Sequence, residues 1–419
     1  MGHPLLLVQL LVILLVARSI AWALRWLGQP PVVGEMIAGL VLGPPVFGAL
    51  APQWQASLFP AASLGALQSL STLGLVLFMM VVGAELRMPG GAPRQLAAAG
   101  WIGGLGVVVP MLLGFGIAPT LYAGYAPSGV AFWPFAMFLA TAVAITALPV
   151  MARILKERKL TGSVPGRLAI AAAAVADALA WLALAFVVAL ISAQGDWAPF
   201  WRSAVGLVSL LAVAWGLLRP LCSHLLRRHA PDGIAGGAVL GFLLIGALGC
   251  AAMTEWLGLH AVFGAFLFGC CLPRDDRLLR GLIERVEHVT VIALLPVFFV
   301  LAGLSTSAGL FTVDAGLALA LVLGVAVAGK VFGGVAGARC AGQGWRDSFA
   351  IGALLNARGM MELVVIKVGL DAGVIDQRMF TILLIMAIAT TVMTTPMVVF
   401  FTRGRERGRK FPARLVKPP

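Results

Sequence analysis

Charged residues are scarce in this sequence. Asp, Glu, Lys and Arg together make up 11% of its 419 residues, whereas 61% are hydrophobic. The mean hydropathy is +1.01. This composition excludes a soluble domain with a solvated surface and predicts an all-α polytopic membrane protein.

Cysteine and histidine are also rare, at five residues each. The cysteines lie mostly inside or beside apolar runs, with no CxxC pair and no even framework of the kind found in extracellular scaffolds, so we interpret them as packing thiols. The histidines are scattered and no H-E-x-x-H motif occurs, which excludes a metalloprotease site. We therefore expect no metal site, no cofactor and no enzymatic activity.

Acidic residues are few, and the formal net charge is +13. The basic residues do not follow one solvated face, as they would for nucleic acid, but gather in every second connection between apolar runs. These connections lie near 25, 87–94, 153–167, 219–228, 274–285, 339–346 and 403–419. By the positive-inside rule they are cytoplasmic, which places the C-terminus inside and the N-terminus outside. We expect no nucleic-acid partner.

Apolar runs predict about 13 transmembrane helices, each needing roughly 20 residues. The first run contains Ala21-Trp22-Ala23, which resembles a signal-peptidase site, but no basic segment precedes it. We interpret it as a retained first helix. An odd count permits two halves in opposite orientation joined by a linking helix, an inverted repeat typical of secondary transporters.

Two spans are irregular. One contains TAVAITALP (141–149) and the other contains GALLNARGMME (352–362). Pro149 cannot donate a backbone hydrogen bond, and Asn356, Arg358 and Gly359 are poor choices for a lipid-facing helix. Both segments predict broken helices that cross at mid-membrane, with an anion between them to neutralise the dipole ends.

Asp177 lies inside the apolar run at 169–191. A carboxylate at membrane depth is costly and by default marks an ion or proton path, so we interpret it as a shared site for a monovalent cation and a proton. The alternative is a structural acid paired with a basic side chain. Lys330, in the middle of another apolar run, either pairs with Asp177, rests neutral, or serves as structural support.

Other polar residues in the irregular spans have open roles. Thr141 and Thr146 either cap the broken ends or offer an oxygen to the ion. Asn356, Arg358 and Glu362 either order the crossing and line the cation route or belong to structural salt bridges.

Residues outside these spans have plainer readings. We expect Glu35 and Glu85 to form structural pairs and His260 to pack. Gly39 and Gly43 suit close helix packing within one subunit or a dimer seam.

Several segments in this order are specific. They include PVVGEMIAGLVLGPPVFG (31–48), ITALPVMARILKERKL (145–160), GRLAIAAAAVADALAW (166–181) and RDSFAIGALLNARGMMELVVIKVGLDAGVI (346–375). They resemble the second monovalent cation:proton antiporter family, which includes plant cation/proton exchangers and glutathione-gated potassium efflux systems. The chain departs from the family at Ala176-Asp177, where relatives carry Asn-Asp or Asp-Asp.

The resemblance implies the Na⁺/H⁺ antiporter fold, with inverted repeats and two crossed broken helices. It implies scaffold and dimerisation helices at 1–90 and 233–310, a mobile core at 91–195 and 311–402, a linker at 196–232 and a basic cytoplasmic tail at 403–419. It further implies a homodimer that works by an elevator-like alternation.

The predicted function is exchange of Na⁺ or K⁺ for H⁺ across the inner (plasma) membrane, with the lipid bilayer as surroundings. A one-for-one electroneutral cycle is preferred, although a lysine that releases its own proton would make the cycle electrogenic. Two alternatives are a sodium-coupled symporter of an organic anion on the same fold, and a transport-inactive homologue that acts as a sensor.

Overall fold

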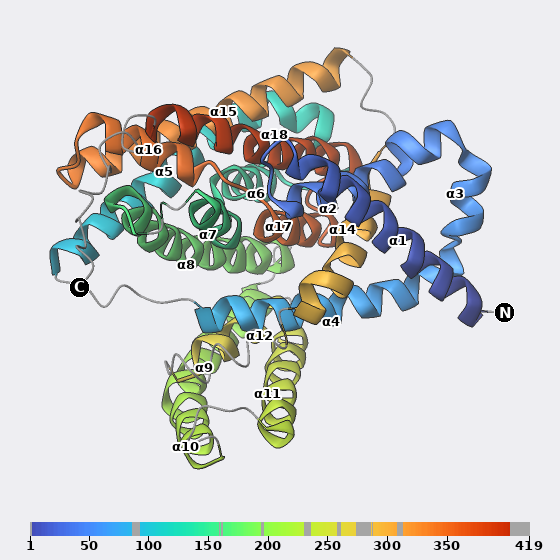
Figure 1. Cartoon of the computed structure of the whole chain (residues 1–419), viewed down its shortest axis with the longest axis horizontal. Coiled ribbons are helices and arrows are strands. Elements are labelled where there is room, and N and C mark those ends of the chain that lie inside the picture. The colour runs from blue at the N-terminus through green and yellow to red at the C-terminus, as the bar shows by residue number, and fades with distance from the viewer. Residues whose placement is uncertain are drawn as a thin grey trace, which may run out of the picture.

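The structure is a computed structural model that describes residues 2–85, 93–158, 160, 162–193, 197–229, 236–257, 261–273, 286, 288–307 and 313–402. Within these residues every regular element is a helix (Figure 1). The first half contains α1 (Gly2–Arg25), α2 (Pro31–Leu42), η1 (Pro44–Gly48), α3 (Pro52–Leu58), α4 (Ala61–Glu85), α5 (Pro93–Tyr125), α6 (Phe132–Ala144), α7 (Leu148–Glu157) and α8 (Val164–Ala193). A connecting segment contains α9 (Trp197–Val213), η2 (Ala214–Leu218) and α10 (Arg219–His229). The second half contains α11 (Gly237–Trp256), α12 (Ala261–Cys270), η3 (Thr290–Leu294), α14 (Leu295–Leu304), α15 (Val313–Cys340), α16 (Trp345–Leu355), α17 (Met360–Asp371) and α18 (Gln377–Thr402).

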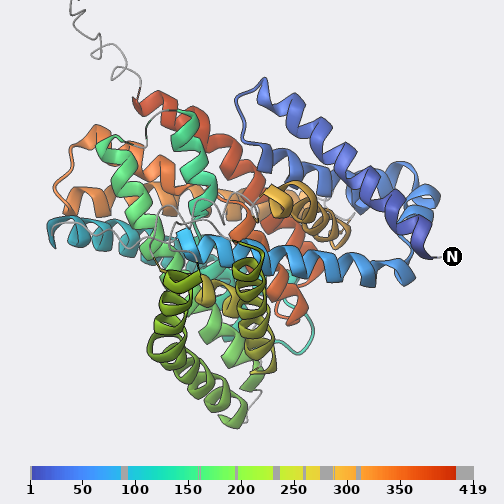
Figure 2. The ribbon, with the colours of Figure 1, turned by 60° about the horizontal axis from the view of Figure 1, so that its bottom comes forward.

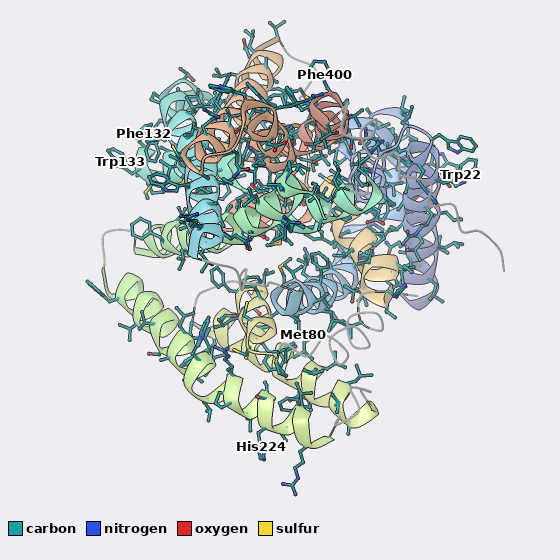
Figure 3. All side chains as sticks on the ribbon, turned by 60° about the vertical axis from the view of Figure 1, so that its left-hand side comes forward. Trp22, Met80, Phe132, Trp133, His224 and Phe400 are labelled. Carbon is teal, nitrogen blue, oxygen red and sulfur yellow. The ribbon has the colours of Figure 1, made fainter. Side chains whose placement is uncertain are left out.

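The described part of the chain holds 9 helices that are long and apolar enough to cross a membrane. Shorter apolar helices occur at Phe132–Ala144, Ala261–Cys270 and Thr290–Leu304. Large apolar side chains cover the outside, as expected for lipid contact: Trp22, Trp133 and Phe400 project outward, whereas Met80 is buried (Figure 3). The chain is therefore a multi-pass membrane protein. The count of thirteen spans and their orientation stay predictions.

Helix packing repeats between the two halves. In the first half α5 packs on α6 and α8, and in the second half α15 packs on α16 and α18, while α5 and α15 pack on each other. Likewise α2 packs on α1 and α14, and α12 packs on α11 and α4. This exchange of equivalent partners is the pattern of the predicted repeat. Figure 1 shows α5, α15, α16 and α18 together on one side and α1, α3 and α4 extending to the other.

The connecting helices stand apart from the rest. Figure 2 shows α9 and α10 projecting with α11 from one face of the molecule. Many of their apolar side chains are exposed, including Trp201, Trp215 and Ile245. They contact the rest of the protein where α9 packs on α8 and where Cys271 donates through Sγ to the carbonyl of Ala214, the first residue of η2, at 3.3 Å. The linker role predicted for 196–232 stays a prediction.

Glycines allow the closest helix approaches. A Cβ on Gly39 would lie 2.1 Å from the carbonyl oxygen of Phe299, and one on Gly303 would lie 1.9 Å from that of Gly39. An equivalent contact joins α4 and α12, where a Cβ on Gly83 would lie 2.1 Å from the carbonyl oxygen of Phe266. Gly39 and Gly43 therefore pack α2 on α14 within one subunit.

Glu35 is buried and forms the predicted structural pair, with Arg18 Nη1 3.7 Å from Glu35 Oε1. The side chain of Glu85, His260 and the tail at 403–419 lie outside the described residues.

Candidate functional site

The two broken helices meet where their irregular segments cross. The helix α6 ends at Ala144 and α7 begins at Leu148, while α16 ends at Leu355 and α17 begins at Met360. The Ala147 N–H donates to the Ala357 carbonyl at 3.0 Å, so the two breaks share a backbone hydrogen bond. Pro149 sits in the first turn of α7, where its missing N–H costs nothing. The predicted crossing is confirmed.

Lys330, on α15, is fully buried beneath this crossing. Its ammonium donates to the Gly106 carbonyl at 3.0 Å, to Thr146 Oγ1 at 2.7 Å and to the Ala144 carbonyl. An ammonium has three hydrogens, so these acceptors satisfy all of them. The lysine thereby fastens α15 to α5 and to the end of α6.

Arg358 covers the same end of α6. Its guanidinium donates through Nη1 to the Ala142 carbonyl at 3.1 Å and through Nη2 to the Val143 carbonyl, and Nη1 also contacts Glu362 Oε1 at 2.9 Å. Arg358 and Glu362 are both fully buried.

The charges at the crossing match the helix dipoles. The carbonyl end of α6 is partially negative, and Lys330 and Arg358 both bind it. Glu362 lies in the first turn of α17, whose N-terminal end is partially positive. The expectation of an anion between the breaks is therefore wrong for α6, because that break presents carbonyl groups, which take cations.

Asp177 is the exception among these buried groups. It lies on α8, is 1% exposed, and neither carboxylate oxygen has a hydrogen-bond partner among the described residues. The predicted direct pair with Lys330 does not form, because the lysine's hydrogens already go to other oxygens. Beside it, Ala176 packs with Val107 and Ala144 in a small apolar cluster.

The two threonines differ. Thr141 donates to Met137 within its own helix at 2.8 Å. Thr146 accepts from Lys330 and donates to the Leu355 carbonyl at 3.3 Å, so it caps the end of α16. Ion ligation by either residue stays a prediction.

Asn356 lies within the second break and donates through Nδ2 to the Thr390 carbonyl at 3.2 Å. Lys367, farther along α17, pairs with Asp371 and takes no part in the Arg358–Glu362 pair.

Sequence reasoning missed the polar face of α18. Thr390, Thr391, Thr394 and Thr395 are all buried there, and Thr391 contacts the backbone of the second break. The available signal was the segment ATTVMTTP (389–396), four hydroxyls in one apolar span.

Four ionisable side chains are thus buried near the crossing: Asp177, Lys330, Arg358 and Glu362. Two are acids and two are bases, so the set is neutral when each carries its usual charge. Among the described residues no group of three or more His, Cys, Asp or Glu could hold a metal ion. Occupation of Asp177 by a monovalent cation or a proton stays a prediction.

Known proteins resemble this chain along most of its length. A family model described as "Sodium/hydrogen exchanger, transmembrane" matches residues 11–403. The chain is 36% identical over 397 residues to the Na(+)/H(+) antiporter NhaS4 of Synechocystis sp., covering 94% of this chain and 96% of that protein.

Two longer relatives match as well. They are the Cation/H(+) antiporter 17 of Arabidopsis thaliana, at 35% identity with 94% of this chain and 48% of the relative covered, and the K(+)/H(+) antiporter 1 of Saccharomyces cerevisiae, at 32% identity with 94% and 46% covered. The chain spans about half the length of these two. The solved structure of the sodium proton antiporter MjNhaP1 from Methanocaldococcus jannaschii matches with a TM-score of 0.66 at 15% identity, over 95% of both chains. This match confirms the fold.

Proposed function

Because the chain belongs to the sodium/hydrogen exchanger family, we propose that it exchanges a monovalent cation, Na⁺ or K⁺, for H⁺ across the membrane, with Asp177 as the site that both ions share. The observation that carries this proposal is the Asp177 carboxylate, which is 1% exposed and has no hydrogen-bond partner among the described residues. A buried ionised carboxylate without a partner is costly, so either a proton or a cation must complete it.

Competition for this carboxylate couples the two ions. A protonated carboxyl group is neutral and binds a metal cation poorly, so the proton and the cation compete for Asp177. By linkage, the apparent affinity for the cation falls as the proton concentration rises. Release of one ion on each side of the membrane by alternating access then gives exchange.

The buried charges favour an electroneutral cycle. With Asp177 occupied by either a proton or a monovalent cation, the set of four groups carries one net positive charge. Both loaded states therefore move the same charge. The contacts of Lys330 are consistent with a positive charge on this residue, because its amino group has three hydrogen-bond acceptors although position 176 carries no acid.

The anion-symporter alternative would use Arg358, the one basic residue in the two irregular segments. Both terminal nitrogens of Arg358 already donate to α6 carbonyls and to Glu362, which leaves its Nε without a hydrogen-bond partner among the described residues. The sensor alternative remains distinct because it predicts no ion movement.

The test uses purified protein in proteoliposomes with a pH-sensitive dye inside. Addition of Na⁺ or K⁺ outside should move protons for the wild type and for Asp371→Asn, an exposed acid on α17 that serves as the control. Asp177→Asn should abolish proton movement, because the uncharged amide neither takes up a proton nor supplies the negative charge that binds a cation. Exchange retained by Asp177→Asn would reject the shared site, and no exchange by the wild type would favour the sensor.

A further inference from the structure

The second break interrupts the regular helical hydrogen bonds between Leu355 and Met360. The N–H groups of Asn356 and Ala357 still donate to carbonyls of α16, but other main-chain groups of the break find their partners on other elements. The Ala357 carbonyl finds one in the Ala147 N–H of the first break. The next residue, Arg358, finds its partner on the opposite side.

That partner is the hydroxyl of Thr391 on α18. Thr391 Oγ1 accepts from the Arg358 N–H at 3.0 Å and donates to the Arg358 carbonyl at 2.5 Å. One buried hydroxyl thus contacts both main-chain polar groups of Arg358, and its single hydrogen is shared between the Arg358 and Ala387 carbonyls. A threonine in a membrane helix commonly bonds only to its own backbone, and Thr391 also contacts the Ala387 carbonyl at 2.8 Å.

Neighbouring threonines do not share this role. Thr390 Oγ1 donates to Met386 and Ala387 in its own helix, and Thr394 Oγ1 donates to Thr390 at 2.9 Å. Of these three hydroxyls, only that of Thr391 contacts the break.

Fixing the Arg358 backbone fixes where its guanidinium can reach. The side chain donates to the Ala142 and Val143 carbonyls and to Glu362, all fully enclosed. The planar guanidinium can donate to two carbonyls at once only if the main chain of Arg358 is held in a fixed position.

We infer that Thr391 is a positioning residue for transport: its hydroxyl clamps the main chain of Arg358, so that the guanidinium stays on the carbonyl end of α6 beside the ion site. This inference rests on the proposed function for its effect on transport. It does not rest on that function for its effect on the backbone. The clamp acts through Arg358 and touches no ion.

Two measurements test the clamp on the full-length protein. The first is amide hydrogen exchange of peptides covering 356–359, followed by mass spectrometry. Thr391→Val keeps the side-chain shape and removes the hydroxyl, so exchange there should accelerate roughly tenfold. Thr391→Ser keeps the hydroxyl and should exchange like the wild type. Thr394→Val is the matched control on the same helix and should also leave these peptides unchanged.

The second measurement is cation-driven proton movement per folded protein in proteoliposomes. Thr391→Val should lower the maximal rate about tenfold with little change in the cation concentration for half-maximal rate, because the Asp177 oxygens are untouched. Thr391→Ser should restore the rate. Thr391→Cys, whose thiol is a weaker hydrogen-bonding group, should lie between the two and serves if the valine variant does not fold.

The outcomes separate the two ideas. The clamp would be overturned if Thr391→Val showed the amide hydrogen exchange and the transport rate of the wild type. It would also be overturned if Thr394→Val changed both measurements as much as Thr391→Val does. If the wild type moves no protons while Thr391→Val still loosens residues 356–359, the proposed function fails and the clamp stands.

Discussion

Two ion pairs in this part of the chain show how burial changes the contribution of an ion pair to stability. Arg358 and Glu362 lie 2.9 Å apart with both side chains fully enclosed, and Lys367 and Asp371 are spaced identically along the sequence, with side chains 26% and 51% exposed. An exposed pair is screened by water and contributes roughly 0 to 1 kcal/mol. A buried pair is different, because removing one partner leaves a charge without compensation.

We therefore expect Glu362→Gln to destabilise the protein by about 3 kcal/mol, since Arg358 and Lys330 would then face Asp177 alone. Asp371→Asn should change stability by less than about 1 kcal/mol. Thermal unfolding of both variants in the same detergent measures the difference. Equal midpoints would show that water reaches the Arg358–Glu362 pair.

At the scale of single residues, the sequence predicted which side chains are buried better than what they bind. Asp177 and Lys330 stand out as charges inside apolar runs. The acceptors of Lys330 do not, because Gly106, Ala144 and Thr146 offer two main-chain carbonyls and a hydroxyl from separate elements. A main-chain carbonyl has no signature in a sequence.

At the scale of the elements, helix contacts in the outer part of the protein depend on bare backbone. The helix α2 crosses α14 at Gly39 and Gly303, where each lies against a carbonyl of the other helix. Such contacts replace the hydrophobic driving force, which is weak between helices in lipid.

The expected result for Gly39→Ala is loss of this packing, because the new Cβ would meet the Phe299 carbonyl oxygen at 2.1 Å. Backbone cannot yield as a side-chain tip would, so we expect destabilisation of about 2 kcal/mol or more. Gly241→Ala on α11 has nothing within 4 Å of its Cβ and should behave like the wild type. Yield of monodisperse protein and its unfolding midpoint report both, and tolerance of Gly39→Ala would mean that α2 and α14 are looser than they are here.

The helix breaks were more predictable than the helix ends. Pro149, Asn356 and Gly359 mark the two interruptions by chemistry alone, and the structure has both. The hydroxyl stripe on α18 was missed, because a threonine can satisfy itself against its own helix and so gives no sign of a second contact.

On the scale of the whole molecule, the packing pattern of one half recurs in the other, and the four buried charges lie where the halves meet. The repeat followed from the alternation of basic loops and from two irregular spans in matching positions. The division into scaffold and moving core followed only from the family resemblance, and it stays a prediction.

If the proton-loaded and cation-loaded states carry the same charge, the rate of ion exchange should not depend on the membrane potential. We expect the rate of Na⁺-driven proton movement in proteoliposomes to be unchanged when a diffusion potential of either sign is imposed with a permeant anion. A rate that rises with one sign and falls with the other would show that Lys330 gives up a proton during the cycle.

The two cations fixed on the end of α6 also bear on valence. Lys330 and Arg358 are buried together with the carboxylates of Asp177 and Glu362, and in a poorly polarisable interior the energy of confining excess charge grows steeply with its amount. A singly charged ion leaves one unit of excess, whereas Mg²⁺ or Ca²⁺ would leave two. With both bases protonated, we therefore expect the residues that brace the broken helix to disfavour alkaline-earth ions at Asp177 as well.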